Sequence, residues 1–510
     1  MKKNIQLSIS PENYNTDNVE RLIRLHTGIK DDNLHYFIQK ESLDCRWRPI
    51  YNLNITVSDC NDLEMSETAP FRDVSKADRT VAVIGAGPCG LMAALKLIQY
   101  GIKPIIIERG APVEQRKKDI AQIYRSGIVN KNSNYCFGEG GAGTFSDGKL
   151  YTRSNKKGDV REVLNLLVHF GASDKILYQS HPHIGTDILS KIIKNIRNTI
   201  EEYGGKYLFN TNVTDFLVKD GCAEGVITSA GDKILADRII LAAGHSAKNI
   251  YQLFYERGWA IEAKPFAMGV RVEHPQQLIN KIQYKGNVIA ELPPAEYSLA
   301  YTFNNRGVYS FCMCPGGIVI PTQETDGIMV VNGMSNSKRN GKFANSAIVV
   351  SVNVNDVPEY SKYGSLSLLR FQQACERNMF VERQLCPAQR ITDFVEGRVS
   401  QSLATTSYKP GLVSSNMNEL LPKFISRHLK SGFGYFNTKM KGFITDEANI
   451  IGLESRTSSP VRIVRDIHTL EHMSLKKLYP CGEGAGYSGG ITSSAIDGIN
   501  VAGKIYESFA

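Results

Sequence analysis

Alternating and helical patterns of apolar residues divide the chain into a short N-terminal unit and a longer remainder. In residues 1–60, the segments IQLSIS, LHYFIQKE and IYNLNITVS alternate like strands, and DNVERLIRLHTG has helical spacing. Thr16 or Asp17 can cap this helix, and Gly28 can end it. The order strand, helix, strand, strand predicts a small α+β module. Residues 61–78 are polar and aperiodic, which predicts a linker.

From Arg79 the pattern becomes that of an α/β protein. An apolar strand is followed by a glycine turn, a helix and a second strand, and apolar residues then recur at helical spacing in 159–170 and 187–203. Short strand-like runs from KYLFN to ADRIILAAG predict a β-meander that leads into a buried strand. Residues 260–440 mix strands, among them FAMGVRVEH and AIVVSVNV, with a helix at 365–379. The length of 510 residues favours two or three domains.

Composition excludes several classes of protein. The 60 Lys and Arg residues against 51 Asp and Glu give a formal charge of +9, and the charges are mixed, with no long basic block. A solvated surface is favoured, while attraction of anionic ligands such as dinucleotides or RNA stays open. The chain has no signal-peptide run, no apolar stretch of transmembrane length and no Cys-x-x-Cys spacing among its ten cysteines. We therefore expect a cytoplasmic protein without a membrane segment, a disulfide framework or a metal site.

The segment VAVIGAGPCGLMAALKLIQYGIKPIIIE carries the strongest signal for chemistry. Gly85, Gly87 and Gly90 have G-x-G-x-x-G spacing between the apolar strand Val81–Ile84 and a helix. The first glycine permits the tight turn, the second leaves room for a diphosphate, and the third lets the helix pack closely on the strand. The helix N-terminus attracts the diphosphate, and Glu108, at the end of the next strand, can accept hydrogen bonds from a ribose. This order of elements predicts a dinucleotide-binding fold for NAD or FAD.

Two later segments resemble the other cofactor-contacting motifs of FAD proteins. ADRIILAAGHS is similar to the second flavoprotein motif, an apolar strand that ends at small residues, here Ala243 and Gly244. LYPCGEGAGYSGGITSSAIDGINVAGKI is similar to the C-terminal FAD motif. That motif usually has an aspartate for the ribitol where this chain has Glu483, and its helix start, here Gly490 and Ile491, lies near the flavin pyrimidine edge. The cofactor that this resemblance implies is FAD.

Further segments extend the likeness over nearly the whole chain, among them FGEGGAGTFSDGKLYT, EAKPFAMGVRVEH, YSFCMCPGG and ESRTSSPV. The chain resembles a bacterial family of FAD-dependent dehydrogenases whose substrate is unassigned. The resemblance implies a glutathione-reductase-like, Rossmann-type FAD domain in 79–260 and 441–510, an inserted mixed α+β substrate domain in 261–440, and a ferredoxin-like module in 1–60. The residues expected to contact FAD are Gly85, Gly87, Pro88, Cys89, Gly90, Glu108, Arg109, Gly140, Gly141, Ala142, Gly143, Lys149, Val213, Ala243, Gly244, Gly482, Glu483, Gly490 and Ile491.

The glycine-rich loop 137–150 is expected to run close to the cofactor, because its glycines let the backbone approach a ligand. It would carry Asp147 and Lys149 toward the flavin ring. There Lys149 could stabilise reduced flavin or polarise a substrate carbonyl. The alternative is a lysine that is solvated or that pairs with the diphosphate.

Three other side chains are candidates for the substrate side of the flavin. Glu454 and Arg456 precede the C-terminal motif, where Arg456 could hold an anionic group or form a structural pair with the glutamate. His245 follows the second motif and could transfer a proton, although a structural role is the alternative. His181 and His183 have no third ligand nearby in sequence and make a poor metal site.

Together these features predict an FAD-dependent oxidoreductase that transfers hydride or electrons to a small-molecule substrate. No G-x-G-x-x-G occurs in residues 245–440, so NAD(P)H would dock transiently and this region would contain no separate nicotinamide domain. No DNA or membrane partner is expected, and the oligomeric state stays open. The alternative is a flavoprotein that acts on or binds RNA or protein, as in tRNA modification or regulation, for which Arg46, Trp47 and Arg48 are the small basic-aromatic cluster.

Cys312 and Cys314 in VYSFCMCPGG are expected to remain reduced. On a regular strand, residues two apart lie roughly 6.5–7 Å apart at Cα. Disulfides mostly need about 4.4–6.8 Å with converging side chains. We therefore predict apolar packing of two thiols. A redox role beside the flavin is the alternative.

Overall fold

The structure, a computed structural model, describes residues 2–29, 34–60, 69–152, 158–287 and 290–509. Its N-terminal module has β1 (Lys3–Ile9), α1 (Thr16–Thr27), β2 (His35–Asp44) and β3 (Ile50–Ser58) in an antiparallel sheet of order β1-β3-β2. Inward-facing residues such as Ile23, Leu53 and Ile55 are fully buried and form its core. The helix is capped by Asn15, whose side chain accepts from the Asn18 N–H, so the expected Thr16 or Asp17 cap was wrong by a residue or two; Gly28 ends the helix with φ 74°, as expected.

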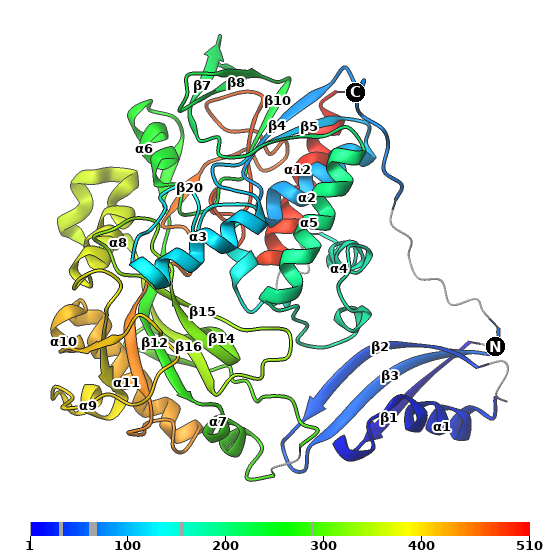
Figure 1. The fold of residues 1–510 in the computed structure, drawn as a ribbon, viewed down its shortest axis with the longest axis vertical. Helices are drawn as coiled ribbons and strands as arrows, with labels where there is room; N and C mark the ends of the chain where they lie inside the picture. Colours follow the sequence, from blue (N-terminus) through cyan, green and yellow to red (C-terminus); the bar gives the residue numbers. More distant parts are fainter. Residues whose placement is uncertain (1, 30–33, 61–68, 153–157, 288–289, 510) are drawn as a thin grey trace.

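A parallel sheet of order β21-β10-β4-β5-β6 holds the glycine-rich motifs. Its strands are β4 (Thr80–Ile84), β5 (Lys103–Ile107), β6 (Lys206–Leu208), β10 (Arg238–Leu241) and β21 (Leu478–Pro480). The helices α2 (Pro88–Gln99), α5 (Thr186–Glu202) and α12 (Ile491–Glu507) lie side by side on one face, with α4 (Val160–His169) beyond them (Figure 1). Because the three motif strands β4, β10 and β21 are neighbours and parallel, their glycine turns meet at one edge of the sheet.

The other face of the parallel sheet is covered by smaller elements. The predicted β-meander is present as β7 (Val213–Lys219), β8 (Cys222–Thr228) and β9 (Lys233–Leu235). Beside it lie α6 (Lys248–Glu256) and the two-stranded sheet of β11 (Ile261–Ala263) and β20 (Val461–Ile463). The remaining elements of this half are α3 (Val113–Ser126) and the 3-10 turns Ala142–Phe145 and Asp174–Leu177.

A second, eight-stranded sheet forms the other large half of the molecule, at the lower left of Figure 1. Its order is β13-β14-β16-β12-β19-β17-β18, and β15 pairs with β14. These strands are β12 (Phe266–Pro275), β13 (Ala300–Phe303), β14 (Arg306–Pro321), β15 (Val331–Met334), β16 (Phe343–Val352), β17 (Cys386–Arg390), β18 (Leu412–Ser414) and β19 (Asn449–Glu454). Around them lie α7 (Gln276–Gln283), α8 (Ser367–Asn378), α9 (Ile391–Glu396), α10 (Met417–Leu420), α11 (Lys423–Lys439) and the 3-10 helices Val354–Asp356 and Pro358–Leu366.

The strand β19 lies beyond residue 440, where the inserted domain was expected to end. It pairs with both β12 and β17, so a boundary at that residue would separate a central strand from its sheet. Almost every pair in this sheet is antiparallel, the exception being β17 with β18. The described part of residues 245–440 therefore contains no second complete dinucleotide-binding fold. In the part of the chain that the structure describes, no helix combines the length and apolar character needed to span a membrane.

Candidate functional site

One cavity of about 360 Å³ lies where the two large halves meet. The turns after β4, β5 and β10, the glycine-rich loop before Lys149 and the start of α12 line one part of it. Phe311, Cys312 and Asn332, from the eight-stranded sheet and its attached strand β15, line another part. The cavity therefore joins the nucleotide-binding motifs to residues of a different layer.

The first glycine motif has the geometry that its spacing predicts. Gly85 has φ 103°, and a Cβ there would lie 2.4 Å from the Ala242 carbonyl oxygen. A Cβ on Gly90 would lie 2.0 Å from the Gly85 carbonyl oxygen, so only glycine lets α2 approach β4. At Gly87 the nearest atom to an added Cβ is 3.9 Å away, and this residue lines the cavity. Open space at the helix start is what a bound diphosphate requires.

Glu108 is buried at the end of β5 and ties two cofactor loops together. Its carboxylate accepts hydrogen bonds from the N–H groups of Ala86 at 2.9 Å, Gly110 at 2.8 Å and Gly138 at 3.0 Å. A carboxylate offers about four acceptor positions, so one remains for a ribose hydroxyl. The role in ribose binding stays a prediction, and the loop contacts are a structural role that the sequence did not indicate.

Arg116 is a functional support that sequence reasoning missed. It lies in the basic run QRKK on α3, which is typical of a solvated helix face, yet it is fully buried. Its guanidinium donates to the carbonyl oxygens of Asn134 at 2.8 Å, Glu139 at 2.8 Å and Gly141 at 2.7 Å. These bonds hold the glycine-rich loop against the cavity. The dense glycines of loop 137–150 were the only sequence signal that such a support was needed.

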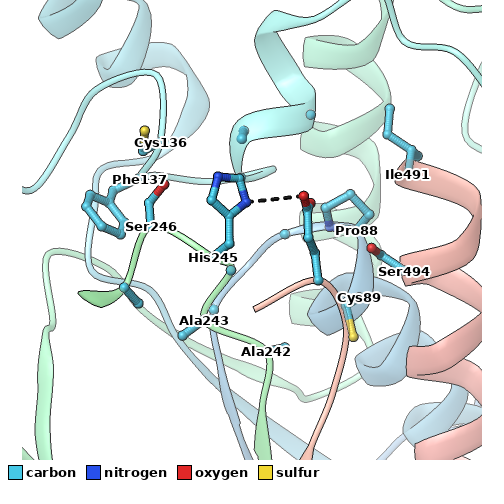
Figure 2. A pocket seen from close by; sticks show the side chains of 18 of the residues that line it. Pro88, Cys89, Cys136, Phe137, Ala242, Ala243, His245, Ser246, Ile491 and Ser494 are labelled. Carbon is cyan, nitrogen blue, oxygen red and sulfur yellow. Dashed lines mark ion pairs between the residues drawn. The ribbon is translucent and has the colours of Figure 1, made fainter. Parts of the chain in front are cut away.

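The second and third motifs meet through a side-chain pair. His245 follows β10, Glu483 follows β21, and His245 Nδ1 lies 3.2 Å from Glu483 Oε1 (Figure 2, dashed line). Both residues line the cavity. Gly244 and Gly489 leave more than 4 Å of open space where a Cβ would project. Thus the turns that resemble FAD motifs face a common space.

Lys149 lines the cavity, but its ammonium group is bound to the protein. It donates to the Met313 carbonyl oxygen in β14 and lies 3.9 Å from Glu296. Asp147 also lines the cavity, with its carboxylate held by Arg339 through a 3.0 Å hydrogen bond and a second, shorter one. Burial opposes ionisation of Asp147, but the charge of Arg339 outweighs it and lowers the pKa of the carboxyl. Asp147 is thus engaged with Arg339 and does not present a free carboxylate to a flavin.

Arg456 and Glu454 do not pair with each other. Arg456 Nε lies 3.1 Å from Glu376, and its Nη2 contacts Glu324; both carboxylates also accept from Lys248 at 2.9 Å. This buried network of two cations and two carboxylates occupies the Arg456 guanidinium. The alternative of a structural Glu454–Arg456 pair was therefore wrong, because Glu454 pairs with Arg271 and Arg456 pairs with other glutamates.

Glu454, the last residue of β19, pairs with Arg271. The Arg271 Nη1 atom lies 2.8 Å from Glu454 Oε2, and both side chains are fully buried. Burial raises the pKa of Glu454 to about 7, against the opposing charge of the arginine. Arg271 also donates to Asn345 at 2.7 Å and to the Cys312 carbonyl oxygen at 2.5 Å. It thus joins Glu454 to the cavity wall.

Cys312 and Cys314 are free thiols of unequal exposure to the cavity. Cys312 lines the cavity, and Cys314 is buried behind it. A hydrogen bond from Cys314, together with the charges of Arg271 and Lys149, outweighs burial and lowers the pKa of the Cys312 thiol to about 6. The Cys-x-Cys motif is visible in the sequence, but the cations beside it, Arg271 and Lys149, come from distant segments.

Most of the expected site residues line this cavity. The exceptions are Gly90, Gly140 and Gly482, which support the turns from behind, and Glu454. His181 and His183 do not face each other as metal ligands, since His181 pairs with Glu296 and His183 donates to Ser337. Cavity residues that the sequence did not single out include Cys136, Thr211, Asn212, Ser246, Asn249, Ile250, Phe311, Asn332 and Ser494.

A different group, Cys89, Cys481 and Asp497, places three ligand atoms within 4.8 Å of one another. The two sulfur atoms are 2.9 Å apart. Asp497 already binds Arg465 at 2.7 Å and accepts from the Gly482 N–H at 2.8 Å. The carboxylate is thus used in holding the C-terminal motif together.

The fold and the cavity define a Rossmann-type dinucleotide-binding protein, and comparison with known proteins narrows this class. A family model described as FAD binding domain matches residues 78–141, and one described as FAD-dependent protein, C-terminal domain-like, matches residues 265–457. An uncharacterized protein from Clostridium beijerinckii is 42% identical over 432 residues, which are 84% of this chain and 80% of that protein. The chain belongs to this family of FAD-dependent proteins, and its cofactor is FAD.

Solved structures are more distant. The salicylate hydroxylase substrate complex is 12% identical, with 85% of this chain and 80% of that chain covered and a TM-score of 0.36. A geranylgeranyl bacteriochlorophyll reductase-like protein from Thermoplasma acidophilum is 12% identical, over 84% and 79% of the two chains, with a TM-score of 0.35. Values this low support no inference about substrate or mechanism.

Proposed function

We propose that this protein is an FAD-dependent oxidoreductase that exchanges hydride or electrons with a small organic substrate. The observation that carries the proposal is the single cavity that the three glycine-rich turns share with Phe311, Cys312 and Asn332. FAD lying along the turns would place its ring toward these residues and leave the substrate on their side. We further propose a glutathione-reductase-like arrangement, with residues 79–260 and the C-terminal segment as the FAD domain, 261 to about 456 as the substrate domain, and a ferredoxin-like N-terminal module.

The chain's own residues would bind and orient both partners. Bound FAD supplies two-electron redox chemistry. The start of α2 and Gly87 would hold the diphosphate, and Glu108 would accept from the ribose. The Lys149 ammonium group would either release Met313 and Glu296 and lie near the flavin ring, or keep these contacts and form part of the wall of the substrate site. His245 and Glu483 would face the cofactor as a proton-holding pair.

The electron donor is the part of this proposal that one experiment can test directly. Because the described part of 245–440 has no second dinucleotide fold, NADH or NADPH would dock transiently over the flavin. Anaerobic titration of the yellow protein with each nucleotide, followed by flavin absorbance, should show bleaching by one of them. Dithionite is the control, since it reduces any bound flavin. If dithionite bleaches the flavin but neither NADH nor NADPH does, nicotinamide nucleotides are excluded as the electron donor. Protein purified without flavin would contradict the proposed function itself.

The alternative of RNA or protein recognition gains no support from the basic-aromatic cluster. Arg46 pairs with Asp44 at 2.6 Å, and Trp47 is 87% exposed, with the Lys285 ammonium 5.9 Å from its ring centre. One solvent-exposed tryptophan beside a neutralised arginine does not make a stacking platform with a basic groove. An enzyme with a small substrate remains the function that we propose.

A further inference from the structure

The segment Phe311–Cys314 interrupts the strand β14 beside the cavity. Phe311 pairs with Ala347 and Cys314 with Asn345, so Cys312 and Met313 on β14 face the single residue Ser346 on β16. This two-against-one arrangement is a β-bulge. Cys312 adopts φ 46°, a left-handed conformation that costs free energy for a residue other than glycine. The regular strand spacing that favoured two separate thiols therefore does not apply here.

The bulge folds the Cys314 thiol back onto Cys312. The neighbouring Cys314 thiol is the largest contribution that lowers the pKa of Cys312. The Cys314 sulfur also lies 3.4 Å from the Cys312 carbonyl oxygen. Backbone strain beside an active cavity is a recurring feature of functional residues. Here the strained residue is Cys312, the residue that the Cys314 thiol contacts.

Two cations flank this dithiol. Arg271 Nη2 donates to the Cys312 carbonyl oxygen at 2.5 Å and lies 3.6 Å from the Cys314 sulfur. Lys149 donates to the carbonyl oxygen of Met313, between the two cysteines. Positive charge next to a thiol stabilises the thiolate, which is the form that reacts in thiol chemistry. Of the two, Cys312 reaches the cavity and Cys314 is enclosed behind it.

We propose that Cys312 and Cys314 form a dithiol–disulfide couple that exchanges two electrons with FAD. This inference deepens the proposed function and rests on it. In the oxidising direction, the Cys312 thiolate and the Cys314 thiol lose two electrons and one proton, and a bond forms between their sulfur atoms. Oxidised flavin takes up the two electrons and the proton and becomes the anionic, two-electron-reduced form. Cys312, on the cavity side, is the sulfur that a thiol or disulfide substrate would meet.

The first test counts electrons in the holoenzyme. Protein is oxidised with ferricyanide, freed of the reagent and titrated anaerobically with dithionite. The wild type should take up about four electrons per FAD, because a flavin and a disulfide each accept two. Cys312→Ser and Cys314→Ser should each take up about two. A Cys375→Ser variant is the matched control, because this buried thiol lies outside the cavity, and it should behave as the wild type.

The second test needs no variant and therefore does not depend on how the variants fold. Thiols are counted in denaturant after oxidation and after reduction of the native protein. The oxidised form should show two fewer thiols than the ten that the sequence contains, and the missing pair should map to the peptide that carries Cys312 and Cys314. If all thiols persist and the flavin alone takes up two electrons, the couple does not exist, although the FAD-dependent function stands. If no flavin is bound or reduced, the proposed function fails first.

Discussion

His245 Nδ1 lies 3.2 Å from Glu483 Oε1, so the residues that follow two neighbouring strands, β10 and β21, meet beside the cofactor cavity. FAD proteins of the resembled type usually have an aspartate at the position of Glu483. The longer glutamate side chain spans the distance to the histidine. The pair links the second and third motifs and keeps a charged acceptor on the cavity wall.

The first prediction follows from this pair. Glu483→Gln keeps the size of the side chain but removes its charge, and hydrogen bonds to charged groups contribute about 1.5–3 kcal/mol. We expect FAD affinity to fall about tenfold, measured by flavin fluorescence on reconstitution of the apoprotein. Glu262→Gln, which removes an exposed partner of Arg462, should leave the affinity unchanged. Equal affinities for Glu483→Gln and the wild type would show that the carboxylate positions His245 and does not contact the cofactor.

A second prediction concerns the diphosphate turn. Gly87→Val should fold, because the nearest atom to an added Cβ is 3.9 Å away, but its side chain would occupy the space that the diphosphate needs. The protein should be purified with less than about a tenth of the wild-type flavin, which corresponds to a loss of at least about 1.4 kcal/mol. Gly434→Ala, at a helical position with open space around it, is the matched control. A fully loaded yellow Gly87→Val protein would refute the assignment.

Arg456 gives a third prediction, which separates a structural role from substrate binding. Arg456→Met leaves Glu324 and Glu376 with Lys248 as their only cation in the network, and breaking a buried pair costs about 3–5 kcal/mol. Chemical denaturation should show a loss of this order. Adding Glu376→Gln should recover part of it. Arg462→Met, at an exposed pair, should cost less than about 1 kcal/mol. A stable Arg456→Met protein with a raised KM would instead identify a substrate-binding arginine.

The fourth prediction is a pH dependence of stability that Glu454 causes. The pKa of Glu454 is about 7 in the folded protein, whereas the ordinary value for a glutamate is 4.5. Between these values the unfolded chain is ionised while the folded protein still holds the proton, so the unfolding free energy falls as pH rises from about 4.5 to about 7. Glu454→Gln has no such titration. The difference in unfolding free energy, wild type minus variant, should decrease by up to about 3 kcal/mol across this window and stay constant above it.

Measuring the difference between the two proteins cancels other groups that titrate in the same range, such as Glu139, whose pKa burial also raises to about 7. Two parallel stability curves between pH 4.5 and 7 would contradict the prediction. They would indicate that Arg271 keeps the carboxylate ionised in the folded state.

Local sequence determined the elements and the cofactor. Gly85 has a backbone conformation that favours glycine, Gly90 lies against the Gly85 carbonyl oxygen, and the amphipathic spacing of α4 and α5 reports which face is buried. Such requirements act within a few residues, so a motif reveals them. The antiparallel N-terminal module, the meander β7–β9 and the cavity positions of most expected residues followed from the same kind of signal.

Only the tertiary structure decided which charged and sulfur-containing side chains meet. Arg456 binds Glu324 and Glu376, 132 and 80 residues away, although Glu454 is two residues distant in sequence. The basic run around Arg116 looks solvated, yet burial beside carbonyl groups makes this arginine a support of the cofactor loop. The bulge at Cys312 depends on the register between β14 and β16, which apolar alternation does not encode. Long-range pairing and register are properties of the assembled sheet, so the pattern of the chain determined that FAD binds, and packing decided which side chains surround it.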